Sequence, residues 1–446
     1  MIEGGIKVAV VLAILTLLSN VLVYDLGKAW QDEAQIVGWG RELLGYDANR
    51  ASLDPESGEQ YVLFAPLSQS MIAWADENVG RLRHRIVTMF FALLSGVAMI
   101  MLLLALRVNR GVSVIAGLSL FMDPMYLLSW SGGRADSIAF FFAISGSGLL
   151  TYGLRQHVAF RWMWILLGSV FFVLSGLSWI TSVVLLFQLV ALILGVRGTR
   201  WLRAFLSGNR WTIVGLSVVL IGGLVLLSSL GNIWDVLIIL YDKPGSLRRF
   251  FSSFNWNYPL LVVFMLALVS SWSRNLVIPL SALVIASGVF MSTDIYVFRA
   301  IYLLPVMYAI LALCATGRKG LLTKWGLLIL LGLNFIVSGY FMPGMKLRNA
   351  DLAKPDKVIS ALAEGSWTPE ARVYCAPWEL VMLGYGYFQP VRHFTSFRLS
   401  QALELREDLD YLILPKTHET MSQWPGAEVI CDDCGDYGPY LVVSLN

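Results

Sequence analysis

The chain has 446 residues, of which 57% are hydrophobic and only 14% are charged. Soluble globular chains carry about 25% charged residues, so this composition excludes an ordinary soluble protein. The net charge of +3 gives no indication of a nucleic-acid partner.

Apolar segments of membrane-spanning length recur from the N-terminus to the last quarter of the chain. A helix needs about 20 mostly apolar residues to cross a bilayer, and eleven segments meet or approach this length. They are residues 6–24, 86–106, 111–128, 137–154, 162–177, 180–196, 211–229, 259–270, 276–291, 300–316 and 326–341. No small-residue cleavage site follows the first segment, which favours a retained helix over a signal peptide. The sequence therefore predicts a polytopic α-helical membrane protein with about 11 transmembrane helices.

Basic residues are concentrated in every second connection between these segments. If the N-terminus is cytoplasmic, the inner segments hold 13 lysines and arginines but only one acid, Glu3. These segments are 1–7, 107–110, 155–161, 197–210, 271–275 and 317–324. The positive-inside rule then predicts a cytoplasmic N-terminus and, after an odd number of spans, an extracytoplasmic tail. The short loops and compact tail suggest the inner membrane of a bacterium.

Two large outer loops are expected before the tail. The first, residues 25–85, contains two segments, 33–44 and 66–82, whose apolar residues gather on one helical face. Both are too short and too polar to span, so we expect helices that lie in the membrane interface. The second large outer loop covers residues 230–257.

The tail, residues 342–446, is predicted to form a small extracytoplasmic α/β domain after a transmembrane domain of residues 1–341. Strands are expected at residues 372–376, 391–397, 411–415, 427–431 and 440–445, with short helices at 379–384 and 400–405. Cys431 and Cys434 are two residues apart in the tail, which favours a disulfide in an oxidising compartment. A structural zinc site needs about four Cys or His ligands and is less favoured, while free thiols remain an alternative.

An acidic pair, Asp32 and Glu33, follows the outer end of the first apolar segment. A carboxylate beside a membrane-embedded cavity can take a proton from an acceptor hydroxyl and so act as a general base. A neighbouring acid can hold a metal or orient the acceptor. The alternative is a pair of acids at a helix N-terminus, where the helix dipole favours them.

Arginines at outer helix ends are candidate phosphate ligands. Arg134 and Asp136 lie in the tight turn Gly132-Gly133-Arg134-Ala135-Asp136, where Asp136 either supports the arginine or caps the next helix. Arg134, and likewise Arg299 at the start of the tenth segment, either binds a lipid phosphate or extends toward the headgroups. Further basic residues of the second outer loop either extend an anion-binding rim or lie in a solvated loop: Lys243, Arg248 and Arg249.

Asp123, followed by Pro124, lies inside the third apolar segment. A charge at such a depth costs about 2.5–3.5 kcal/mol on insertion scales and usually faces a polar cavity. Protonation, or a hydrogen bond to a backbone group near Pro124, is the alternative. The four histidines are scattered without metal-ligand spacing, and no nucleotide-binding motif is present.

In combination these motifs resemble the membrane-embedded C-type (GT-C) glycosyltransferases, the superfamily of protein O-mannosyltransferases and aminoarabinose transferases. The resemblance covers the membrane part of the chain and depends on the order of its motifs. These are Asp32-Glu33-Ala34, the long outer loop, Arg81-Leu82, Arg134-x-Asp136, the break at residues 176–181, and Arg299, Tyr302 and Pro305.

The resemblance implies a transferase that moves a sugar from a polyprenyl-phosphate donor to a lipid, polysaccharide or protein acceptor at the outer face, with inversion. It implies Asp32 as general base, Glu33 as its acidic partner and Asp136 as a supporting acid. Arg134 and Arg299 become phosphate ligands. Whether the enzyme needs a divalent metal stays open, and no nucleotide cofactor is expected.

Two other classes of function remain in view. A transporter or flippase for a lipid-linked saccharide would show paired repeats and discontinuous helices near the bilayer midplane. A non-catalytic receptor or assembly subunit would use the tail as its binding module.

Overall fold

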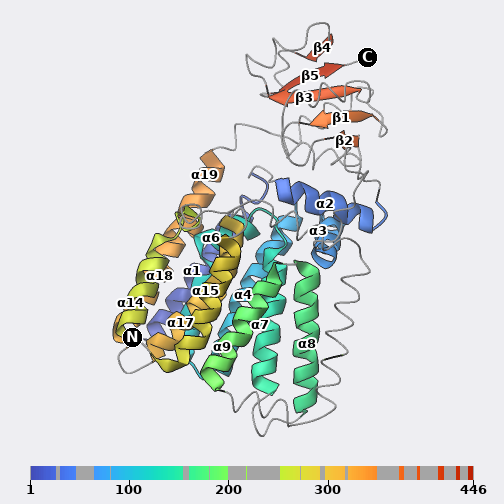
Figure 1. Ribbon diagram of the computed structural model, residues 1–446. Helices are drawn as coiled ribbons and strands as arrows, with labels where there is room; N and C mark the ends of the chain where they lie inside the picture. Colours follow the sequence, from blue (N-terminus) through green and yellow to red (C-terminus); the bar gives the residue numbers. More distant parts are fainter. Residues whose placement is uncertain are drawn as a thin grey trace. The chain divides into compact units, whose positions relative to one another are not determined.

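The computed structural model describes residues 2–26, 31–46, 65–80, 82–153, 160–179, 181–198, 217, 252–271, 273–291, 297–316, 320–348, 371–375, 389–391, 410–415, 428–431 and 440–444 (Figure 1). The chain divides into two compact units. The first comprises Met1–Leu22, Leu63–Ser68 and Arg85–Pro343, and the second comprises Val23–Val62, Gln69–His84 and Gly344–Asn446. The predicted boundary at residue 341 stays a prediction.

The first unit is helical throughout its described residues. Its elements are α1 (Ile2–Val21), α4 (His84–Ala105), α5 (Arg110–Phe121), α6 (Pro124–Trp130), α7 (Asp136–Gly153), α8 (Arg161–Ser178), α9 (Ser182–Arg197), α14 (Tyr258–Ser270), η3 (Arg274–Leu276), α15 (Val277–Met291), α16 (Val297–Ala300), η4 (Ile301–Leu303), α17 (Leu304–Thr316), α18 (Leu321–Phe335) and the π-helix η5 (Ile336–Phe341). A last helix, α19 (Met342–Arg348), begins in the first unit, and most of its residues belong to the second.

Three helical stretches among the described residues are long and apolar enough to cross a membrane. They are Gly4–Val21, His84–Ala105 and Leu321–Arg348, and a fourth is added if the bent pair α5–α6 counts as one span. Five shorter apolar helices accompany them. The helical membrane architecture is therefore confirmed, whereas the number of about 11 spans stays a prediction.

The third expected segment is not one continuous helix. It breaks between α5 and α6, which meet at a bend of 54°. The cause is local: Pro124 occupies the first position of α6, and the Asp123 side chain caps that helix by accepting a hydrogen bond from the Met125 amide at 2.9 Å.

Glycines allow two helix pairs to approach at backbone distance. A Cβ on Gly117 of α5 would lie 2.6 Å from the Gly96 carbonyl of α4, and a Cβ on Gly146 of α7 would lie 2.8 Å from the Gly168 carbonyl of α8. Small residues at these positions thus let the helices pack closely. Figure 1 shows α7 and α8 side by side. The break predicted at residues 176–181 is present but begins later than expected, since α8 continues to Ser178 and α9 begins at Ser182.

The second unit contains α2 (Gln31–Leu43), most of α3 (Pro66–Asn78) and a five-stranded sheet. The two helices match the predicted segments of the first outer loop. The strands are β1 (Arg372–Cys375), β2 (Gln389–Val391), β3 (Tyr411–Pro415), β4 (Glu428–Cys431) and β5 (Tyr440–Ser444).

The sheet order is β2-β1-β3-β5-β4. β1 pairs in parallel with β2 and β3, while β5 pairs antiparallel with β3 and β4. Four strands fall where the sequence predicts them, but β2 begins at Gln389 and overlaps the expected strand at Val391 alone. The two short helices expected between strands lie outside the described residues. That the tail is a separate extracytoplasmic domain stays a prediction.

Candidate functional site

The acidic pair lies at the start of α2. Asp32 is the second residue of this helix, and its side chain lies outside the described part of the structure. Glu33 is fully buried, and its Oε1 lies 2.9 Å from Nε2 of His84. The carboxylate of Glu33 is therefore bound to a histidine that sequence reasoning had not connected with it.

His84 is bound through both ring nitrogens. Its Nδ1 lies 3.0 Å from Oδ1 of Asp76, an acid near the end of α3, and His84 itself is fully buried. The same Asp76 oxygen accepts a hydrogen bond from the Leu82 amide at 2.8 Å. Ionised carboxylates only accept hydrogen bonds, so both contacts are satisfied when both ring nitrogens carry hydrogen and the imidazole is a cation.

This carboxylate–histidine–carboxylate cluster (Glu33, His84 and Asp76) joins three separate segments of the second unit. It connects the start of α2 to the end of α3 and to the residue at which α4 begins. The cluster therefore fixes the first turn of α2, where the predicted general base Asp32 also lies. Within the described residues, no group of three His, Cys, Asp or Glu side chains is arranged to hold a metal ion.

A second polar cluster lies in the first unit, around the turn between α6 and α7. Gly133 adopts a positive φ of 68°, and the amide of Arg134 bonds to the Ser129 carbonyl at 3.2 Å, which closes the turn. Asp136 is the first residue of α7 and is fully buried. The predicted tight turn is thus confirmed.

Asp136 binds three side chains. Its Oδ2 accepts hydrogen bonds from Nε of Arg134 at 2.8 Å and from the Ser129 hydroxyl at 2.7 Å, and its Oδ1 accepts one from the Tyr302 hydroxyl at 2.6 Å. Tyr302 in η4 is itself held because its carbonyl accepts a hydrogen bond from Gln188 at 3.2 Å. The carboxylate therefore orients an arginine, while the role of Asp136 as a supporting acid stays a prediction.

Arg134 is only 3% exposed, and its guanidinium lies 5.7 Å from the ring centroid of Trp179. A buried guanidinium is stabilised by a bonded carboxylate and by an aromatic face, and both are present here. Such an oriented cation can bind a planar anionic group such as a phosphate.

Asp123 belongs to a third cluster, which explains its place inside a span. Besides capping α6, its Oδ2 accepts hydrogen bonds from Asn257 at 2.6 Å and from the Tyr308 hydroxyl at 2.9 Å. Asn334 completes the network by donating to Tyr308 at 2.9 Å and to the Ser119 carbonyl at 3.0 Å. The network connects α5, α6, α14, α17 and α18, so Asp123 has the backbone bond near Pro124 that was the alternative to a polar cavity.

The remaining predicted residues are placed only in part. Arg299 lies in α16 and is half-buried. Cys431 ends β4, but Cys434 lies outside the described residues, as do Arg248 and Arg249. The disulfide and the anion-binding rim therefore stay predictions.

Sequence reasoning missed His84 as a site residue, together with Asp76, Asn257 and Tyr308. Histidine at the first position of an apolar helix was the one available signal for His84, because such a side chain needs polar partners when buried. Asn334 and Tyr308 lie in apolar segments and Asn257 lies beside one, and the composition of these segments does not indicate that the three side chains meet.

The arrangement of helices is that of the membrane-embedded C-type glycosyltransferases, and the chain is an integral membrane protein with this fold. Among solved structures it is similar to ArnT from Cupriavidus metallidurans bound to undecaprenyl phosphate, with 13% identity, a TM-score of 0.67 and 98% of each chain covered. It is also similar to the Archaeoglobus fulgidus oligosaccharyltransferase in complex with zinc and sulfate, with 15% identity, a TM-score of 0.54, and 91% of this chain and 68% of that one covered.

The arabinofuranosyltransferase AftD from Mycobacteria gives 14% identity and a TM-score of 0.56, with 99% of this chain and 41% of that one covered. No protein-family model and no curated protein matches the sequence. The likeness at these identities is one of fold, and it is the fold that the resemblance of the motifs implied.

Proposed function

We propose that the chain is a glycosyltransferase that moves a sugar from a polyprenyl-phosphate donor to an acceptor at the extracytoplasmic face. The supporting observation is the match over 98% of both chains to ArnT, which was solved with undecaprenyl phosphate. The buried arginine of the α6–α7 turn gives this chain a cation suited to the phosphate of such a donor.

The predicted site residues take distinct parts in the proposed reaction. Asp32 removes the proton from the acceptor hydroxyl, and the acceptor oxygen attacks the anomeric carbon from the side opposite the phosphate. The bond from the anomeric carbon to the phosphate oxygen breaks, and polyprenyl phosphate leaves with the electron pair. The configuration at the anomeric carbon is inverted as a result.

Arg134 stabilises the negative charge that grows on the departing phosphate, and Asp136 keeps the guanidinium oriented for this task. Arg299, Arg248 and Arg249 are proposed as further contacts to the donor phosphate. Glu33 positions Asp32 indirectly: its carboxylate is bound to His84 and so holds the first turn of α2, in which Asp32 lies.

Release of free polyprenyl phosphate tests this proposal. Purified protein in detergent is given a panel of polyprenyl-phosphate sugars together with host membrane extract as the source of acceptor. The native protein should release polyprenyl phosphate from one donor, and Asp32→Asn should abolish release. Asp25→Asn, the same substitution at an exposed position of the same loop, should leave release unchanged.

Full activity of Asp32→Asn would move the base to another residue while keeping the transferase class. Release by neither protein, with both shown to be folded, would overturn the class itself.

A transporter for a lipid-linked saccharide is the second candidate, and the bent pair α5–α6 is the observation that favours it. Discontinuous helices are common in transporters, where they expose backbone groups to a substrate. At this break the Asp123 carboxylate already binds the Met125 amide, so that backbone group is not available to a substrate, which argues against a transporter. Transfer of lipid-linked sugar between leaflets of proteoliposomes, without release of polyprenyl phosphate, would favour the transporter.

A further inference from the structure

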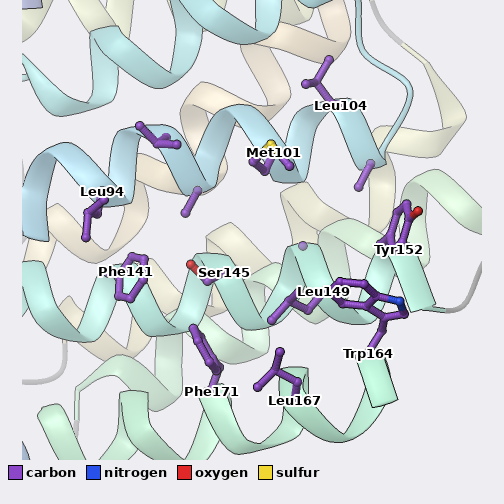
Figure 2. Close-up of a pocket in the computed structure, with 14 residues that line it drawn as sticks. Leu94, Met101, Leu104, Phe141, Ser145, Leu149, Tyr152, Trp164, Leu167 and Phe171 are labelled. Atoms are coloured by element: carbon purple, nitrogen blue, oxygen red, sulfur yellow. The ribbon is translucent and has the colours of Figure 1, made fainter. Parts of the chain in front are cut away.

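An apolar cavity of about 630 Å³ lies in the first unit, between α4, α7 and α8. Figure 2 shows Leu94, Phe141 and Phe171 at one end and Leu104, Tyr152 and Trp164 at the other. The polar groups among its lining residues are the hydroxyls of Ser145 and Tyr152 and the indole nitrogen of Trp164. Such a lining suits a hydrocarbon chain and offers little to a sugar.

The cavity is open on the side that the bilayer covers. Met101 and Leu167 line it and are nevertheless 61% and 38% exposed. An apolar chain can therefore enter from the surrounding lipid without passing through water.

The length of the cavity matches one leaflet. From Leu94 to Ala105, α4 rises about 16 Å at about 1.5 Å per residue, and half of a hydrocarbon core is about 15 Å thick. Tyr152 and Trp164, in edge contact at 5.4 Å, close one end with the residue types that mark a membrane–water interface. An acyl chain of a glycerophospholipid fits this length, whereas a long polyprenyl chain exceeds it.

Positive charge gathers at the same end. The guanidinium of Arg197 donates a hydrogen bond to the carbonyl of Ala105, one of the lining residues. Arg107 and Arg110 follow directly after α4 and are exposed. The connection 154–161 to α8 contains two more arginines and no acid. A headgroup at this end would therefore be favoured if it carried negative charge.

We propose that this cavity binds one acyl chain of an anionic glycerophospholipid, with the phosphate of the headgroup beside Arg107 and Arg197. The lipid comes from the leaflet that contacts this end of α4, which the positive-inside rule assigns to the cytoplasm. The site is separate from the proposed donor site, because Asp136 begins α7 while Tyr152 lies in its last turn.

Photo-crosslinking tests the proposal and needs no transfer activity. The full-length protein in detergent is mixed with phosphatidylglycerol that carries a diazirine on one acyl chain, irradiated, and mapped by peptide mass spectrometry. We expect labels on the cavity residues of α4, α7 and α8. Phosphatidylcholine with the same acyl chain should label these residues about fivefold less, in line with the contribution of one basic residue near an anionic headgroup.

Three variants make the test specific. Ser145→Phe places a ring inside the cavity and should abolish its labelling, while Ser281→Phe, the same change at an exposed site of α15, should not. Arg107→Gln, at an exposed position, should reduce labelling by phosphatidylglycerol and leave that by phosphatidylcholine unchanged.

Equal labelling by the two lipids would refute the proposed preference for an anionic headgroup. Labelling that survives Ser145→Phe, or that polyprenyl phosphate displaces at an equal concentration, would overturn the phospholipid as occupant.

Discussion

Replacing His84 by leucine tests whether the carboxylate–histidine–carboxylate cluster supports the fold. Leucine fills much of the buried space but removes both hydrogen bonds, the one to Glu33 at 2.9 Å and the one to Asp76 at 3.0 Å. The two carboxylates stay buried and lose their shared partner.

The magnitude follows from the contacts that are lost. Hydrogen bonds to charged groups contribute about 1.5–3 kcal/mol each, so the loss of two predicts about 3–6 kcal/mol. Removing one partner of a buried ion pair costs about 3–5 kcal/mol, which agrees. The free energy of unfolding should therefore fall by several kcal/mol.

The assay is the fraction of protein that stays monodisperse in detergent after heating, measured by fluorescence-detected size exclusion. His84→Leu should lose heat resistance strongly, and Arg83→Leu, at the exposed preceding residue, should lose little. The triple variant His84→Leu, Glu33→Gln, Asp76→Asn should recover part of the loss, because it removes the buried charges. If His84→Leu resists heat as the native protein does, or the triple variant recovers nothing, the electrostatic reasoning fails.

Two further predictions concern the helical unit. Asp123→Ala removes the acceptor of the Met125 amide, the Asn257 side-chain amide and the Tyr308 hydroxyl. Stability in detergent should therefore fall by about 3–9 kcal/mol, at about 1–3 kcal/mol for each buried donor. Asp123→Asn should lose less, and an equal loss would refute the role of the cap. Gly117→Leu forces a side chain against the Gly96 carbonyl, 2.6 Å from the new Cβ, so the yield of folded protein should drop, and an undiminished yield would refute the close contact of α4 with α5.

Local composition was enough to predict most of the helical architecture. Runs of apolar residues bounded by arginines or glycines gave the positions of α1, α4, α7, α8 and α17 to within a few residues, because a span has a minimum length. The turn that holds Arg134 and Asp136 was also predicted, since two glycines before a charged pair end a helix.

Contacts between distant segments could not be predicted in this way. Glu33 and His84 are separated by 51 residues, and the bond from Asp123 to Tyr308 joins residues 185 apart. Apolar periodicity says which residues are buried but not which polar side chains meet there. The bend at Asp123 was missed for a related reason: the apolar run continues through it, and the interruption comes from one proline and one capping carboxylate.

The glycine contacts determine which parts of the helical unit can yield. The backbones approach closely at Gly96–Gly117 and at Gly146–Gly168, with no side chains between them that could change rotamer. The pairs α4–α5 and α7–α8 therefore each form a rigid helix pair. Near the start of α7 the two helix pairs are joined by a hydrogen bond, which the Ser95 hydroxyl of α4 donates to the Ser137 carbonyl of α7 at 3.1 Å. Further along, the cavity lies between α4, α7 and α8, although a Cβ on Gly148 of α7 would still lie 3.7 Å from the Leu102 backbone of α4. Both helix pairs therefore help to hold the start of α7 in place, and with it the turn that carries Arg134 and Asp136.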